Sequence, residues 1–192
     1  MGTILPFSNL IPAEHRVAQE TALITGPSSG LGMDLARLFA ADGSNLILVS
    51  RNADKLEALA TELRAGHGIN VHVIPRDLSV PGSSRELFDE VTSRGLQVDV
   101  LVNNAGFGHL AKFQDIPLDT YTGNIQLNVT AVTELTHLFL PAMLERQRGR
   151  ILNIGSTASF QPGPNAAVYF ATKAYVRFFS EALAEELRGS GV

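Results

Sequence analysis

The stretch TALITGPSSGLGMDLARLFAADG, residues 21–43, predicts a buried strand, a glycine-rich turn and an amphipathic helix in succession. TALIT is a short apolar run, and Leu35, Leu38 and Phe39 recur at helical spacing until Gly43 provides a stop. A strand that leads through a glycine-rich turn into a helix is the first part of a βαβ unit. This stretch therefore predicts that the chain builds a parallel sheet.

The same alternation continues along the chain. Further strands are predicted at residues 45–50, 70–75, 98–103 and 149–156, and further helices at residues 52–66, 84–94, 118–145 and 165–188. Short apolar strands between helices imply a parallel sheet covered on both faces. Right-handed crossovers favour a doubly wound, Rossmann-like α/β fold with three layers. We expect one domain, residues 20–192, after an N-terminal lead-in, residues 1–19.

The end of the chain, RGSGV, follows the last predicted helix at a point where another strand would be expected. The strand at residues 149–156 would then be an uncovered apolar edge, which natural proteins usually avoid. We therefore expect the sheet to lack the last strands of a complete fold. The alternative is a naturally short chain whose edge is covered by a partner.

The composition argues against several classes of protein. The 192 residues are 45% hydrophobic and 18% charged, with a net charge of −4 and no basic run, which argues against a nucleic-acid partner. No cysteine is present and the five histidines lack paired spacing, so no metal site is expected. The chain shows neither a secretory signal pattern nor an uninterrupted apolar run of about eighteen residues. We expect a cytoplasmic protein without a membrane partner.

The turn TGPSSGLG, residues 25–32, stands where a doubly wound sheet binds a dinucleotide. Its spacing is G-x-x-x-G-x-G, which differs from the G-x-G-x-x-G of the standard fingerprint. Glycines allow the backbone to approach a pyrophosphate, and the helix N-terminus presents free N–H groups to it. The alternative is a tight connection without a ligand. The residues of the turn predicted to contact the cofactor are Gly26, Ser28, Ser29, Gly30, Leu31 and Gly32.

The second predicted strand ends in VSRN and offers Arg51 without a carboxylate. An acidic residue at this position binds the ribose 2′-hydroxyl of NAD, whereas an arginine accommodates the 2′-phosphate of NADP. Arg51 therefore favours NADP(H) over NAD(H). The alternative is that Arg51 opens the following helix in solvent.

In YFATK, Tyr169 and Lys173 stand four residues apart and share one face of the last predicted helix. An ammonium near a phenol favours its ionised form, and the phenol can then exchange a proton near neutral pH. The sequence thus offers a proton-transfer pair, although two neighbours on a helix surface would show the same spacing.

TGPSSGLG, NNAG at residues 103–106 and YFATK, taken together, resemble the motifs of the short-chain dehydrogenase/reductase family from about residue 20 onward. Ser156 lies thirteen residues before Tyr169, as the catalytic serine of that family does. Asn128, in QLNVTA on the long predicted helix, matches the fourth active-site position. The resemblance implies that Asn128, Ser156, Tyr169 and Lys173 form the catalytic set.

The resemblance also implies a role for each member. Tyr169 would protonate the carbonyl oxygen in reduction or deprotonate the alcohol in oxidation. Lys173 would favour the ionised form of Tyr169 and bind the nicotinamide ribose, and Ser156 would donate a hydrogen bond to the substrate oxygen. Asn128 would hold a water that links Lys173 to solvent.

Four further residues are implied on the adenosine side of the cofactor. Asp77, in RDLS, matches an aspartate that contacts adenine, although it could equally be a helix N-cap residue. Asn103, Ala105 and Gly106 would border the adenosine side and the sheet. Asn104 is interpreted as structural.

These motifs predict an NADP(H)-dependent oxidoreductase that interconverts a ketone or aldehyde and the corresponding alcohol. Two alternatives are a non-catalytic dinucleotide-binding or redox-sensing protein of the same fold and a sugar-nucleotide epimerase or dehydratase. The latter group usually has a TGxxGxxG turn, which this chain lacks. Because the later strands of the family are missing, we expect the chain alone to be poorly active.

The helices predicted at residues 118–145 and 165–188 are also expected to form an interface between subunits. The first of these helices carries large apolar residues over a wide arc, namely Leu127, Leu135, Leu138 and Leu140. This apolar surface is wider than a single face of the sheet can cover. Members of the family that the chain resembles commonly assemble through these two helices. The resemblance and the apolar surface together predict a homodimer or homotetramer. The alternative is a core helix that packs wholly within one subunit.

Overall fold

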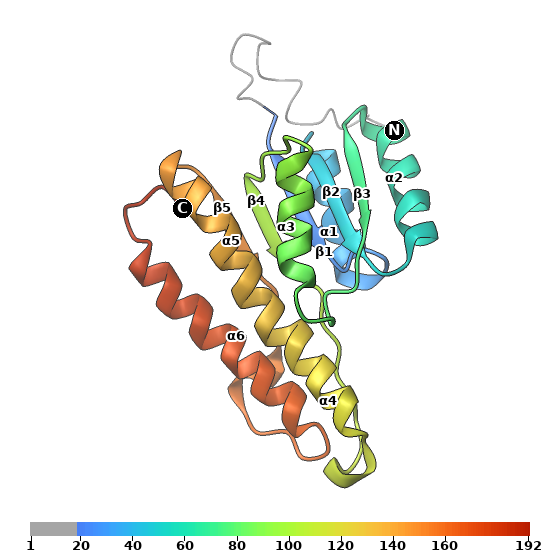
Figure 1. Ribbon diagram of the computed structural model, residues 1–192, viewed down its shortest axis with the longest axis vertical. Coiled ribbons are helices and arrows are strands. Elements are labelled where there is room, and N and C mark those ends of the chain that lie inside the picture. Colours follow the sequence, from blue (N-terminus) through green and yellow to red (C-terminus); the bar gives the residue numbers. More distant parts are fainter. Residues whose placement is uncertain (1–18) are drawn as a thin grey trace, which may run out of the picture.

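The structure, a computed structural model, describes residues 19–192. Its centre is a five-stranded sheet in the order β3-β2-β1-β4-β5, and every neighbouring pair is parallel (Figure 1). The strands are β1 Thr21–Thr25, β2 Asn45–Ser50, β3 Val71–Pro75, β4 Val100–Asn103 and β5 Arg150–Asn153. The predicted lead-in, residues 1–19, lies outside the described residues except for Gln19.

Helices cover both faces of the sheet. They are α1 Gly30–Ala41, α2 Ala53–His67, α3 Ser83–Ser93, α4 Leu118–Ile125, α5 Ala131–Glu145 and α6 Ala167–Glu186. One apolar cluster joins α1 and α2 to Ala22 and Ile24 of β1, and the other joins α3 and α5 to Leu23. Successive β1 residues thus enter opposite cores, as the period of a strand requires. The three-layer, doubly wound fold predicted from the sequence is confirmed.

Two elements differ from their predicted forms. The strand predicted at residues 149–156 is only Arg150–Asn153, since the chain leaves the ladder where the carbonyl of Ile154 accepts a hydrogen bond from Lys173 Nζ at 2.7 Å. The helix predicted at residues 118–145 contains a π-helical turn, Gln126–Thr130, between α4 and α5. Such turns widen a helix and are frequent at functional sites.

Strand β5 forms one edge of the described sheet and pairs only with β4 there. Its residues are alternately exposed and half-buried, and Leu152 keeps 39% of its surface exposed. The apolar edge expected from the sequence is therefore present.

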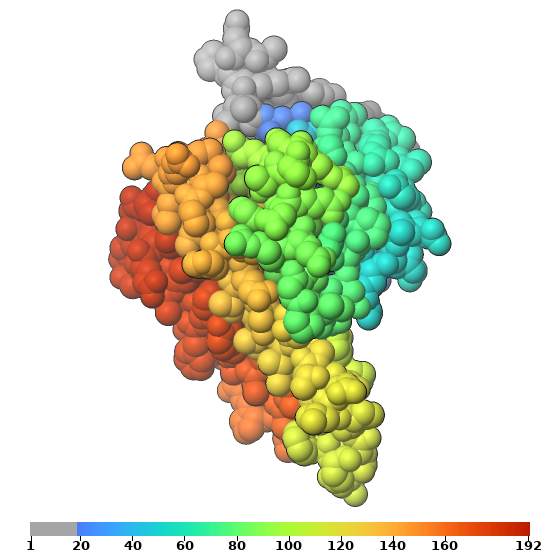
Figure 2. Space-filling model, viewed as in Figure 1, coloured from blue at the N-terminus to red at the C-terminus, as the bar shows by residue number. Residues whose placement is uncertain are grey.

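The continuous helix from Leu118 to Glu145 is long and apolar enough, by length and composition, to cross a membrane. In this fold it is a core helix, because Leu135, Phe139 and Met143 are buried against the sheet. Buried helices of globular domains satisfy the same criterion, so the finding alone does not indicate a span. The chain around α4 projects from the lower end of the molecule in Figure 2, where Leu110, Phe113 and Leu118 are exposed.

Candidate active site

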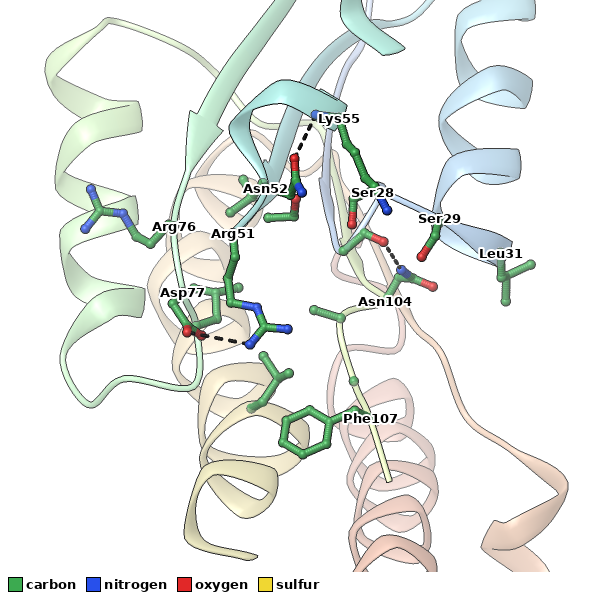
Figure 3. Close-up of a pocket in the computed structure, with 18 residues that line it drawn as sticks. Ser28, Ser29, Leu31, Arg51, Asn52, Lys55, Arg76, Asp77, Asn104 and Phe107 are labelled. Atoms are coloured by element: carbon green, nitrogen blue, oxygen red, sulfur yellow. Dashed lines mark hydrogen bonds and ion pairs between the residues drawn. The ribbon is translucent and has the colours of Figure 1, made fainter. Parts of the chain in front are cut away.

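A cavity of about 500 Å³ lies at the carboxyl ends of β1 to β4 (Figure 3). This is the edge of a doubly wound sheet where ligands bind, beside β1, where the strand order reverses. The predicted cofactor-binding residues that line the cavity are Gly26, Ser28, Ser29, Leu31, Gly32, Arg51, Asp77, Ala105 and Gly106. Four predicted residues do not line it, namely Gly30, Asn103, Tyr169 and Lys173.

The glycine turn interlocks with the loop after β4. Gly26 has a φ of +70°, and a Cβ there would come within 2.9 Å of the Cα of Ala105. A Cβ on Gly32 would overlap the side chain of Asn104 and lie 2.5 Å from the carbonyl oxygen of Gly26. The glycines therefore do more than expose backbone to a ligand, because they allow two loops of the site to touch.

Thr25 and Asn104 hold this contact together. The Thr25 hydroxyl accepts hydrogen bonds from the backbone N–H groups of Asn104 and Ala105, each at 3.0 Å. The Asn104 amide donates to the carbonyl oxygens of Thr25 at 2.9 Å and Gly26 at 3.2 Å (Figure 3). Asn104 also lines the cavity, so the residue that the sequence marked as structural belongs to the site.

The far rim of the cavity carries two cationic side chains. Arg51 follows β2 with 73% of its side chain exposed, and its Nη1 lies 3.9 Å from Asp77 Oδ2. Lys55 stands on the first turn of α2 and also lines the cavity. The other carboxylate oxygen of Asp77 accepts hydrogen bonds from the N–H and hydroxyl of Ser79. The sequence analysis missed Lys55, although its position four residues after Arg51 was a usable signal.

Lys173 lies on α6 and is almost fully buried. Its ammonium donates to the carbonyl oxygen of Ile154 at 2.7 Å. Burial lowers the pKa of this ammonium below its usual range, because a charged group loses its hydration inside the protein. Lys173 thus holds its proton less firmly than a surface lysine does.

Replacing Lys173 by Met is expected to leave the Tm at about pH 7 equal or higher, because desolvation of a buried ammonium outweighs one hydrogen bond. The difference should shrink as the pH rises. The pKa of Lys173 in the folded protein lies below 10.5, the ordinary lysine value. Between the folded pKa and pH 10.5 the unfolded chain binds more protons than the folded protein, so the stability of the wild type rises with pH in this range. Thermal unfolding at about pH 7 and about pH 10 measures the difference, and a gap that does not change with pH would contradict the expectation.

Tyr169 lies one helical turn before Lys173 and is partly exposed. Its ring packs on the backbone of Gly108, where an added Cβ would come within 2.5 Å of the ring. Between the two residues, the Thr172 hydroxyl donates to the carbonyl oxygen of Tyr169 at 2.8 Å. The same hydroxyl accepts from Asn128 Nδ2 at 3.1 Å, which ties α6 to the π-helical turn.

Asn128 is buried in that π-helical turn and is bonded to protein groups on both sides. Its Oδ1 accepts from the N–H of Phe107 at 3.2 Å, and its Nδ2 donates to the carbonyl oxygen of Phe107 at 2.9 Å. A Cβ on Gly106 would lie 3.1 Å from Asn128 Oδ1 and 3.7 Å from Lys173 Nζ. Residues 106–108 therefore contact Asn128 and Tyr169. The water predicted at Asn128 stays a prediction.

Ser156 caps the short 3-10 helix Thr157–Phe160 that follows β5. Its hydroxyl oxygen accepts from the N–H of Ala158 at 3.1 Å, and its own N–H donates to the Ser159 hydroxyl at 3.3 Å. The capping contact uses the oxygen as an acceptor and leaves the hydroxyl hydrogen to serve as a donor.

Asn103 and Gly30 lie outside the cavity wall. Asn103 is buried in the sheet, where its Nδ2 donates to Asn153 Oδ1 at 2.9 Å and to the Thr136 hydroxyl at 3.3 Å. Its place in β4 puts its side chain on the sheet face that α5 covers, where it meets Asn153 of β5 and Thr136. Within residues 19–192, no group of three His, Asp or Glu side chains is arranged to hold a metal ion.

Residues 20–192 match the family model described as short chain dehydrogenase. The chain is 36% identical over 179 residues to the human protein named very-long-chain 3-oxoacyl-CoA reductase. This match covers 90% of the chain and 56% of that protein. The chain therefore spans little more than half the length of the curated relatives it matches.

Two solved structures have the same architecture. A short-chain dehydrogenase from Sphingobium yanoikuyae in complex with NADPH has a TM-score of 0.84 and 37% identity, over 90% of this chain and 67% of that one. The bulky-bulky ketone specific alcohol dehydrogenase from Comamonas testosteroni has a TM-score of 0.86 and 34% identity, over 91% and 70%. Both resemblances extend over nearly the whole described chain.

Proposed function

Because this chain belongs to the short-chain dehydrogenase family, we propose that it is an NADP(H)-dependent oxidoreductase that interconverts a ketone or aldehyde and the corresponding alcohol. The observation that carries this proposal is the path of residues 106–108. Gly106 and Phe107 line the dinucleotide-sized cavity, while Gly108 packs on the ring of Tyr169, one helical turn before Lys173. One short segment thus joins a cofactor cavity to a proton-transfer pair.

The residues of the cavity fit the pyrophosphate and the 2′-phosphate of NADP(H). The glycine turn leads into α1, whose N-cap residue Ser29 makes no side-chain capping bond. The first N–H groups of α1 therefore lack a side-chain cap, and such groups suit a pyrophosphate. Arg51 and Lys55 supply the positive charge that a 2′-phosphate requires. The NADPH complex of the Sphingobium relative supports the same choice of cofactor.

When bound, the cofactor supplies or accepts the hydride, and the chain manages the accompanying proton. Tyr169 gives a proton to the carbonyl oxygen in reduction and takes one from the alcohol in oxidation. Ser156 donates a hydrogen bond to the same oxygen, where negative charge develops. Lys173 lies one turn along α6 and would bind the nicotinamide ribose of the cofactor.

The substrate we propose is a carbonyl compound with a large apolar substituent. Leu110 stands two residues after Gly108, which touches Tyr169, and 82% of Leu110 is exposed. An exposed leucine two residues along the chain from the contact with Tyr169 suits an apolar group on the substrate. The names of the human relative, a very-long-chain 3-oxoacyl-CoA reductase, and of the bulky-ketone dehydrogenase support this class.

Arg51→Ala and Lys55→Ala are each expected to weaken NADPH binding about tenfold, because a charged hydrogen bond to phosphate contributes about 1.5–3 kcal/mol. Neither change should alter NADH affinity more than roughly twofold, since NADH lacks the 2′-phosphate. Titration followed by nicotinamide fluorescence measures both cofactors. Lys112→Ala serves as the control, because this lysine lies outside the cavity lining. Equal losses for NADPH and NADH would contradict the assignment.

The remaining sequence-based expectations are part of the same proposal. A homodimer or homotetramer would form through α4, α5 and α6, where the exposed large apolar side chains are Leu118, Ile125, Leu144, Tyr175 and Phe178. Of the leucines on which the sequence prediction rested, Leu135 is fully buried in the core. The protein would act in the cytoplasm.

A further inference from the structure

We propose that Asn124, which belongs to no motif of the sequence, is a positioning residue that holds residues 106–108 against the proton-transfer pair. The inference rests on the proposed function, because it concerns the same site. Asn124 lies on α4, four residues before Asn128, and only 2% of it is exposed. It touches neither Tyr169 nor Lys173 through any hydrogen bond of the described residues, so it would act through the segment.

Asn124 and Asn128 both form hydrogen bonds to the backbone of Phe107, in the loop after β4. The Asn124 amide donates to the carbonyl oxygen of Phe107. Asn128 donates to the same oxygen at 2.9 Å and accepts from the N–H of Phe107 at 3.2 Å. Two amides on successive turns of one helix therefore engage both backbone groups of Phe107. The Asn124 amide thus adds a third bond to the two that Asn128 makes, and this bond restricts the loop further.

The residues on either side of Phe107 leave little room for movement. A Cβ on Gly106 would lie 3.1 Å from Asn128 Oδ1 and 3.7 Å from Lys173 Nζ. A Cβ on Gly108 would lie 2.5 Å from the Tyr169 ring. Because the backbone packs this closely on the Tyr169 ring, a shift of Phe107 changes the position of that ring relative to Lys173. The anchor at Asn124 thus bears on the geometry of proton transfer.

Stability does not account for an amide at this position. Asn124 Oδ1 is buried and has no hydrogen-bond partner among the described residues. A buried acceptor without a partner destabilises a fold, and an apolar side chain of the same shape avoids that cost. The carbonyl oxygen of Phe107 would still receive the bond from Asn128. What an apolar residue would lose is the second anchor.

The test compares Asn124→Leu, nearly the same size, with Thr136→Val on the same continuous helix. Thr136 is equally buried and accepts a hydrogen bond from Asn103, but it has no bond to residues 106–108. For the wild type and both variants we would measure amide hydrogen exchange of residues 104–110 and the Tm. Turnover is measured as the steady-state oxidation of NADPH with 4-phenyl-2-butanone as the carbonyl substrate. NADPH affinity is measured by nicotinamide fluorescence.

For Asn124→Leu we expect an equal or higher Tm, roughly tenfold faster exchange in the segment and a kcat lower by about 10- to 100-fold. NADPH affinity should stay within about threefold, because the glycine turn and Arg51 are untouched. Thr136→Val should lower the Tm while leaving exchange in the segment and kcat unchanged. Asn124→Ala, which removes the amide without adding apolar bulk, should loosen the segment in the same way.

Wild-type exchange in the segment for both Asn124 variants would overturn the proposal. A fall in kcat that is fully explained by a smaller fraction of folded protein would also overturn the proposal. Absence of both NADPH binding and NADPH oxidation in the wild-type chain would instead count against the proposed function. The exchange rates would still decide whether Asn124 anchors the segment, so the two failures are distinguishable.

Discussion

Tyr169→Phe is expected to lower turnover by about 10²- to 10⁴-fold, the range that a general acid or base contributes. The phenylalanine ring keeps the packing on Gly108, so only the hydroxyl that exchanges the proton is lost. NADPH affinity should change by no more than about threefold, because Tyr169 does not line the cavity. Steady-state NADPH oxidation and nicotinamide fluorescence measure the two quantities separately.

Tyr175→Phe is the matched control on the same helix. Its hydroxyl lies 2.8 Å from the Thr133 hydroxyl, and it takes no part in the contacts of residues 106–108. This variant should retain wild-type turnover. Unchanged turnover in Tyr169→Phe would remove the tyrosine from the mechanism. Tight NADPH binding without any turnover, in wild type and variant alike, would favour the non-catalytic dinucleotide-binding alternative.

Gly32→Ala is expected to weaken NADPH binding by about 100-fold and to destabilise the fold by about 1–3 kcal/mol, as overpacking of a tight site does. The added methyl group would lie 2.5 Å from the carbonyl oxygen of Gly26, a backbone atom that cannot swing away. The turn and the loop after β4 must then separate, and the cavity between them changes shape. Fluorescence titration and denaturant unfolding measure the two effects.

Gly66→Ala makes the same chemical change in α2, where nothing lies within 4 Å of the added methyl group. It should stabilise the protein by about 0.5–1 kcal/mol, because alanine is the better helix former, and should leave NADPH affinity unchanged. If Gly32→Ala behaved like Gly66→Ala, the close contact between the two loops would not be needed for binding.

The predicted strands and helices rested on patterns that are local in the chain. The apolar runs at residues 21–25 and 45–50 are β1 and β2 with the predicted bounds. Period and length distinguish buried strands from helices over such short spans. The π-helical turn at Gln126–Thr130 could not be predicted in this way, because it depends on the bonds of Asn128 to Phe107 and Thr172 from other elements.

Lys55 could have been found from its place four residues after Arg51, whereas the roles of Asn104 and Asn124 in the site depend on tertiary contacts. Asn104 binds the turn around Gly26, which is 78 residues away in the chain. Asn124 acts on Phe107 across the space between a loop and a helix. Asn103, by contrast, was grouped with the cofactor because its neighbours are, yet its side chain points the other way along β4.

The sequence by itself determined the alternation of strands and helices, the glycine turn and the Tyr169–Lys173 pair, because each depends on residues a few positions apart. Only the tertiary structure decided which of these features meet. The order β3-β2-β1-β4-β5 puts the turn after β1 beside the loop after β4. That loop then bonds to Asn124 of α4 and packs on Tyr169 of α6. Such contacts arise from the packing of elements distant in the chain, and no local period encodes them.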